Sequence, residues 1–250
     1  MGMTRFGPPK ELILLLKHSF SLNTFIETGT YRGDTAVWAA SHFKDVVTIE
    51  YSKSMHNQAV AKYGALTPIN FIFGDSRLIL DKMISDLTEP VFFWLDAHWS
   101  GGHTWGEKEQ CPLIGELEAI NRSKIPHFVF IDDARLFTSP PPLPNCLDQW
   151  PTIDQVIQVI RSRQERVYIV IFEDVIMAVP PYAKEVVAHY CQKSNTESWK
   201  KYGNHSMREK VSDLIKGEGF LVHNIKSMSL GVYRYLQRMV SCIRGVNHQQ

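Results

Sequence analysis

The sequence predicts an α/β protein with a Rossmann-like, doubly wound, mostly parallel sheet, a C-terminal antiparallel hairpin and a helical C-terminal extension. Three observations predict this fold. Short apolar runs alternate with helical stretches, the last two runs are joined by only two residues, and several runs end in an acidic residue. Runs that are apolar on successive positions are typical of strands that helices cover on both faces.

Five strands are predicted before the hairpin, because five short runs are rich in β-branched or aromatic residues. These strands are Thr24–Glu27, Val46–Glu50, Asn70–Phe73, Val91–Leu95 and His127–Ile131. The helical stretches between and after them are Asp34–Phe43, Ser54–Tyr63, Ser76–Leu87, Gly115–Asn121 and Pro151–Ile160.

The hairpin is predicted from Val167–Phe172 and Val175–Val179, since Glu173-Asp174 is a connection short enough for antiparallel strands. Pro180-Pro181 then ends a first domain over residues 1–180. Residues 181–250 form a basic extension, which we expect to pack on the same domain or at a homodimer interface. Its expected helices are Ser206–Lys216 and Met228–Cys242, and its basic residues include Lys200, Lys201, Arg234, Arg238 and Arg244.

Composition excludes several classes of protein. The chain has 27 Lys and Arg against 26 Asp and Glu, which gives no electrostatic case for a nucleic-acid or membrane partner. No apolar stretch approaches the roughly 20 residues that span a bilayer. Cys111, Cys146, Cys191 and Cys242 are widely spaced, which indicates reduced thiols and a cytoplasmic location rather than a disulfide scaffold.

The first strand runs into a turn that contains Gly29 and Gly33 and then into a helix. Glycines let a backbone approach a ligand closely, although a simple tight turn would also explain them. Glu27 stands just before these glycines. A carboxylate in that place would repel a pyrophosphate but would suit a cationic amine.

The next two strands also end in acids. Glu50 lies about 20 residues after Gly29, where an acid can bind the two hydroxyls of a ribose. Asp75, in the turn Gly74-Asp75-Ser76, can accept a hydrogen bond from an exocyclic amine such as that of adenine. Any one of these acids could be a solvated charge at the end of a loop, but three successive strand ends favour a shared ligand.

Taken together, these residues resemble the class I S-adenosylmethionine-dependent methyltransferases over about residues 20 to 180. The first motif of that family is an acid followed by spaced glycines, matched by Glu27, Gly29 and Gly33, with Tyr31 where many members have a middle glycine. The resemblance implies that Glu27 and the Gly29 backbone bind the methionine end, Glu50 the ribose and Asp75 the adenine. It also implies that the cofactor is S-adenosylmethionine and that Thr30, Gly33 and Ser76 contribute to its binding.

A second acidic group follows strands four and five. Asp96 follows the fourth strand, and Asp132 and Asp133 follow the fifth. Because adjacent parallel strands end at the same edge of a sheet, we expect these carboxylates to converge, and a divalent cation such as Mg²⁺ would balance their charge. The alternative is that Asp132 caps a helix and Asp133 pairs with Arg135.

This group is similar to the acids of metal-assisted small-molecule and sugar O-methyltransferases. The resemblance implies that Asp96, Asp132 and Asp133 are Mg²⁺ ligands, and that His98, two residues after the first ligand, is the catalytic base, with Asp96 also in the catalytic group. An imidazole titrates near neutral pH and could take a hydroxyl proton. His98 could equally be a structural histidine.

After His98 comes the glycine-rich segment Ser100–Glu107, which carries His103 and Trp105. We expect it to be a lid over the methyl acceptor, or else a surface turn. A mixed metal site made of Asp96, His98, His103 and Glu107 is a further interpretation.

The sequence therefore predicts a methyltransferase that acts on an oxygen of a small polar or sugar-like acceptor. Two alternatives stay open. One is a nicotinamide-dependent oxidoreductase, which would share Glu50, and the other is a metal-dependent hydrolase that uses Asp96, Asp132 and Asp133. A fold of this kind does not imply turnover by itself.

Overall fold

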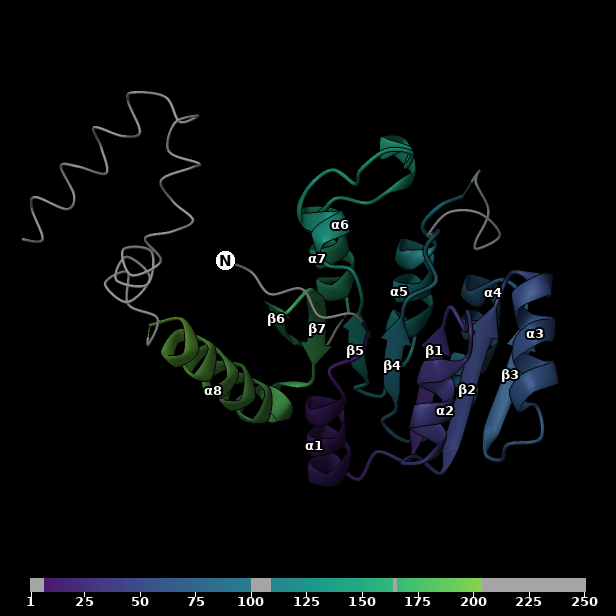
Figure 1. Cartoon of the computed structure of the whole chain (residues 1–250), viewed down its shortest axis with the longest axis horizontal. Helices are drawn as coiled ribbons and strands as arrows, with labels where there is room; N and C mark the ends of the chain where they lie inside the picture. The colour runs from purple at the N-terminus through teal and green to yellow at the C-terminus, as the bar shows by residue number, and fades with distance from the viewer. Residues whose placement is uncertain (1–6, 100–108, 164–165, 204–250) are drawn as a thin grey trace, which may run out of the picture. The chain divides into compact units, whose positions relative to one another are not determined.

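The structure is a computed structural model that describes residues 7–99, 109–163 and 166–203. Its described residues form a seven-stranded sheet of order β3-β2-β1-β4-β5-β7-β6, which can be followed from right to left in Figure 1. All neighbours from β3 to β5 are parallel, and β7 is antiparallel to both β5 and β6. The predicted fold class, with its terminal hairpin, is confirmed.

The strands match the predicted ones to within a few residues. They are β1 Thr24–Thr28, β2 Asp45–Glu50, β3 Ile69–Phe73, β4 Phe92–Leu95, β5 Phe128–Ile131, β6 Tyr168–Phe172 and β7 Val175–Val179. The hairpin turn places Glu173 and Asp174 at φ 47° and 70°. Positive φ at both residues suits the twist of a two-residue hairpin.

The helices between the strands include all those predicted before the hairpin, with shifted ends. They are α2 Asp34–Ala40, α3 Lys53–Tyr63, α4 Ser76–Met83, α5 Leu113–Asn121, the short α6 Arg135–Thr138 and α7 Ile153–Arg161, with 3₁₀ turns at Ile84–Asp86, Leu147–Gln149 and Pro181–Ala183. α7 begins later than predicted because Thr152 and Gln155 form a capping box after Pro151.

Three described α-helices were not predicted: α1 Lys10–Phe20, the short α6 Arg135–Thr138 and α8 Lys184–Gly203. α1 buries Leu12, Ile13 and Leu16, and this helical spacing of apolar residues was the signal in the sequence.

The core lies on both faces of the sheet because side chains alternate along each strand. Phe25, Phe92 and Phe128 are in register across β1, β4 and β5 and pack towards α1, α2 and α8. The next residues along these strands, among them Ile26 and Phe93, pack on the other face against α4, α5 and α7.

The chain divides into two compact units, Met1–Cys191 and Gln192–Gln250, and the sheet belongs to the first. The predicted division at residue 180 falls between the end of β7 and the start of α8. The predicted helices Ser206–Lys216 and Met228–Cys242 lie outside the described residues. No described helix has both the length and the apolar character needed to cross a membrane.

Candidate active site

The parallel strands β1 to β5 end at one edge of the sheet, and the turn after β1 lies at its centre. Gly29, Tyr31 and Gly33 all have positive φ, at 85°, 46° and 80°. A Cβ on Gly29 would lie 2.3 Å from the Asp96 carbonyl oxygen, so only glycine lets this turn cross the end of β4. Tyr31 adopts a left-handed conformation although it is not a glycine.

Glu27 is buried beside this turn. Its carboxylate accepts a hydrogen bond of 2.6 Å from the Thr48 hydroxyl, and Thr48 in turn lies 2.7 Å from the Thr30 hydroxyl. Burial raises the pKa of Glu27 to about 8, and the charge of Asp96 adds to the rise, while the Thr48 hydrogen bond opposes it. Glu27 is therefore a desolvated acid that a nearby positive charge would ionise. Thr30, which we predicted to bind cofactor, supports Glu27 through Thr48.

Glu50 joins the end of β2 to the same turn. One carboxylate oxygen accepts the Tyr31 N–H at 2.9 Å, and the other accepts the Ser52 N–H at 2.8 Å. Each oxygen has a second lone pair, so the carboxylate can still accept two hydroxyls. The structure thus brings Glu50 and the turn after β1 together.

Asp75 is committed to other partners. It is the N-cap of α4, where it accepts the Arg77 N–H, and both of its oxygens also accept hydrogen bonds from the Arg77 guanidinium. Arg77 additionally pairs with Glu109. Ser76 is buried directly after Asp75. The acid that the resemblance assigned to adenine therefore caps a helix and holds an arginine.

The acids after β4 and β5 converge on His98. Its Nε2 lies 2.8 Å from an Asp133 oxygen, and its Nδ1 lies 3.5 Å from an Asp96 oxygen. Burial opposes a positive charge on His98, but the hydrogen bond to Asp133 and the charge of Asp96 outweigh it and raise its pKa. Asp133 also pairs with Arg135 at 2.8 Å, as one alternative in the sequence analysis expected.

Asp96 and Asp132 hold their protons more tightly than free carboxyls do. Desolvation raises the pKa of Asp96 to about 8, with His98 opposing the rise, although 34% of its side-chain surface is accessible. Desolvation and the charge of Asp133 raise the pKa of Asp132 to about 6. Asp132 also accepts the Asp133 N–H at 2.8 Å.

This arrangement does not fit the divalent-metal site that the resemblance implies. The His98 ring stands between Asp96 and Asp133, and Arg135 takes the other oxygen of Asp133. Over residues 7–99, 109–163 and 166–203, no three His, Cys, Asp or Glu side chains are arranged to hold a metal ion. The positive charge among these acids comes from protein side chains.

Two residues that the sequence analysis missed complete the site. Glu116 of α5 is buried with one carboxylate oxygen that has no hydrogen-bond partner among the described residues. Gln110 is also buried, and its side-chain oxygen accepts hydrogen bonds from the Cys146 N–H and the Trp150 indole. Trp150 meets the His98 ring at 5.5 Å, so Gln110 helps to fix the wall behind His98. The only sign of Glu116 in the sequence was its place among the apolar residues of the buried face of α5.

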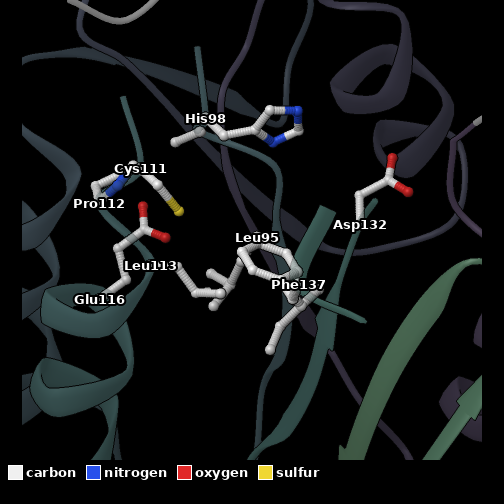
Figure 2. A pocket seen from close by; sticks show the side chains of 10 residues that line it. Leu95, His98, Cys111, Pro112, Leu113, Glu116, Asp132 and Phe137 are labelled. Carbon is white, nitrogen blue, oxygen red and sulfur yellow. The ribbon is translucent and has the colours of Figure 1, made fainter. Parts of the chain in front are cut away.

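A small cavity lies between α5 and the ends of β4 and β5. Its volume of about 10 Å³ is enough for about one water molecule. Figure 2 shows Glu116 and Cys111 on the α5 side of this cavity, with Asp132 on the other side. His98 also lines it. The predicted lid Ser100–Glu107 lies outside the described residues, and so do His103 and Glu107, two of the four residues of the mixed metal site.

Comparison with known proteins gives only distant likenesses. No family model matches the chain, and no curated protein matches it. Among solved structures, the N-methyltransferase NodS from Bradyrhizobium japonicum WM9 is 13% identical, with 68% of this chain and 93% of that chain covered and a TM-score of 0.44. The methyltransferase PaMTH1 from Podospora anserina, bound to S-adenosylhomocysteine, is 17% identical, with 68% and 76% covered and a TM-score of 0.41. At these identities and TM-scores, the comparisons do not establish the activity or the ligand of this chain. Both must be inferred from its own residues.

Proposed function

We propose that this protein is an S-adenosylmethionine-dependent methyltransferase that methylates an oxygen of a small polar or sugar-like molecule. The contact between Glu50 and the Tyr31 N–H carries the proposal. It holds an acid that can bind a ribose against the glycine turn after β1, at the carboxyl edge where ligands of doubly wound sheets bind. The order of the strands, with its terminal antiparallel hairpin, supports the same function.

The buried acids fit a positively charged cofactor. Glu27 is enclosed by protein, and the groups that donate hydrogen bonds to its carboxylate are hydroxyls, among them that of Thr48. A buried carboxylate without a cation is unfavourable, so an ammonium group on the ligand would stabilise its ionised form. In the proposal, Glu27 binds the amino group at the methionine end of S-adenosylmethionine, and Glu50 binds the hydroxyls of its ribose.

When bound, S-adenosylmethionine supplies a methyl group already activated on a positively charged sulfur. The protein must then align the acceptor hydroxyl with that methyl and remove the hydroxyl proton. His98 suits the second task. Its Nε2 is close enough to Asp133 to donate to it, which leaves Nδ1 as the nitrogen that can take the proton. Because the acids here do not fit a divalent metal, the proposal includes no metal.

Isothermal titration calorimetry with S-adenosylhomocysteine and with NAD tests the proposal. We expect S-adenosylhomocysteine to saturate the protein and NAD not to bind. Glu50→Gln should weaken S-adenosylhomocysteine at least about tenfold, because one acceptor for the ribose becomes a donor.

Asp45→Asn is the matched control, since Asp45 is exposed at the opposite end of β2. It should bind like the wild type. Binding of NAD in place of S-adenosylhomocysteine would favour the oxidoreductase alternative, and an unchanged affinity in Glu50→Gln would show that the ribose lies elsewhere.

A further inference from the structure

The hairpin turn between β6 and β7 contacts the segment that follows β5. Asp174, the second residue of this turn, accepts the Arg135 N–H at 2.8 Å with one carboxylate oxygen and pairs with the Arg135 guanidinium through the other. Its carbonyl also accepts the Ala134 N–H at 2.8 Å. Only 6% of the Asp174 side-chain surface is accessible, so this carboxylate is a buried partner of Arg135 rather than a solvated charge on a turn.

Arg135 connects Asp174 to the proposed base. The guanidinium nitrogen that pairs with Asp174 also lies 2.8 Å from one oxygen of Asp133. The other oxygen of Asp133 lies 2.8 Å from His98 Nε2. A row of side-chain contacts therefore runs from the hairpin turn through Arg135 and Asp133 to His98.

This row determines how Arg135 meets Asp133. An arginine beside an aspartate commonly takes both carboxylate oxygens with its forked guanidinium. Here Asp174 holds the guanidinium from the other side, and Arg135 pairs with the Oδ1 atom of Asp133 while Oδ2 is left to His98. Asp174 thus keeps one oxygen of Asp133 for the histidine.

The oxygen that Asp133 offers bears on which nitrogen of His98 carries a proton. Two carboxyl groups face the ring, with Asp133 at 2.8 Å from Nε2 and Asp96 at 3.5 Å from Nδ1. A neutral imidazole has a single N–H, and its hydrogen-bond partners select the nitrogen that bears it. The closer carboxylate favours Nε2, and only that tautomer leaves Nδ1 with the lone pair that the proposed function requires.

We propose that Asp174 is a positioning residue for His98: by holding Arg135 it fixes Asp133 against Nε2 and so selects the tautomer that can take a proton at Nδ1. The inference rests on the proposed function, in which His98 is the base. It adds a residue of the hairpin turn, which acts through Arg135 and Asp133, to those that the reaction requires.

Long-range ¹H–¹⁵N NMR spectra of the full chain test the proposal, because they report which nitrogen of neutral His98 carries the proton. They are recorded without ligand at alkaline pH, and His98→Gln assigns the signals. The wild type should hold the proton on Nε2. Asp174→Asn keeps an oxygen for the Arg135 N–H and suits the positive φ of the turn, but it removes the charge. It should lower the ratio of the Nε2–H to the Nδ1–H tautomer at least about fivefold.

Two further variants separate this role from a general loss of charge. Arg135→Gln should change the tautomer ratio as Asp174→Asn does, and combining the two should change it no further, because the row of contacts is already broken. Asp81→Asn is the matched control. It removes another Asp–Arg ion pair, that of Asp81 with Arg122, which lies outside the row, and it should leave the ratio unchanged.

A wild type with the proton on Nδ1 would overturn the inference, and so would an Asp174→Asn protein with the wild-type ratio. An equal change in Asp81→Asn would overturn it too, since the loss of any ion pair would then have the same effect. The spectra need no ligand, whereas the proposed function depends on binding of S-adenosylhomocysteine by the wild type. Failure of the one is therefore distinguishable from failure of the other.

Discussion

Glu27 illustrates, at the scale of single residues, how burial alone can mark a site for a charged ligand. Its pKa of about 8 means that the carboxyl is mostly protonated at neutral pH in the free protein. A bound ammonium group would favour the ionised form, so binding should displace the proton. The carboxyl is thus poised to ionise when a ligand amine arrives.

Glu27→Gln should therefore weaken binding of S-adenosylhomocysteine about tenfold or more but leave 5′-methylthioadenosine almost unaffected, because that nucleoside lacks the amino-acid end. For the wild type, affinity for S-adenosylhomocysteine should rise with pH from 6 towards 8, since less work is then needed to ionise Glu27. Calorimetry over this range measures both effects. Equal loss of the two ligands in Glu27→Gln would place Glu27 away from the methionine end.

Whether a single site residue could be predicted from the sequence depends on the element that carries it and on its neighbours. Glu50 could be predicted because a strand end fixes the place of its last side chain. Asp75 also follows a strand, but its carboxylate accepts hydrogen bonds from the guanidinium of Arg77, two residues later. No pattern in the sequence predicts that ion pair. Glu116 belongs to a helix, so its direction depends on how α5 is rotated against the sheet.

At the scale of elements, the turn after β1 depends on the close approach between Gly29 and β4. Gly29→Ala should destabilise the protein by about 2 to 5 kcal/mol, because it combines a strained φ with an overlap against backbone atoms. Urea unfolding measures the change.

Gly7→Ala is the matched control, since Gly7 also has a positive φ of 77° but no described atom lies within 4 Å of the added Cβ. It should cost about 1 kcal/mol, from backbone strain alone. Similar losses in the two variants would mean that contact with β4 does not constrain the turn.

The elements themselves could mostly be predicted, since runs such as Val46–Glu50 are too apolar and too short to be helices. α1 was not among the predicted helices, although its buried residues Leu12, Ile13 and Leu16 stand at the spacing of one helix face. The left-handed Tyr31 could not be foreseen, as a tyrosine gives no local sign of a positive φ. It is held there by the hydrogen bond from its N–H to Glu50.

At the scale of the whole molecule, several buried acids near the carboxyl edge of the sheet keep their protons at pH values where free carboxyls are ionised. The pKa values of Glu27, Asp96, Glu116 and Asp132 are all raised by burial. In the unfolded chain these acids ionise near pH 4, so the folded state holds more protons between about pH 4.5 and 8, and their contribution to stability is lost as pH rises through this window.

Thermal unfolding should accordingly show a lower Tm at pH 8 than at pH 6, and S-adenosylhomocysteine should raise the Tm more at pH 8. His127 acts in the opposite direction. Burial lowers its pKa to about 3, so its contribution to stability is complete above pH 6.5 and is lost as pH falls. A Tm that rises from pH 6 to pH 8 without ligand would contradict this description of the acids.

The most direct test of the central claim follows the backbone amides of Tyr31 and Ser52 by NMR during addition of S-adenosylhomocysteine. Both donate to Glu50, so both resonances should shift in a saturable way, while that of Asp45 at the far end of β2 should stay in place. Saturable binding that leaves Tyr31 and Ser52 unmoved would contradict the claim that the ends of β1 and β2 bind the nucleoside together.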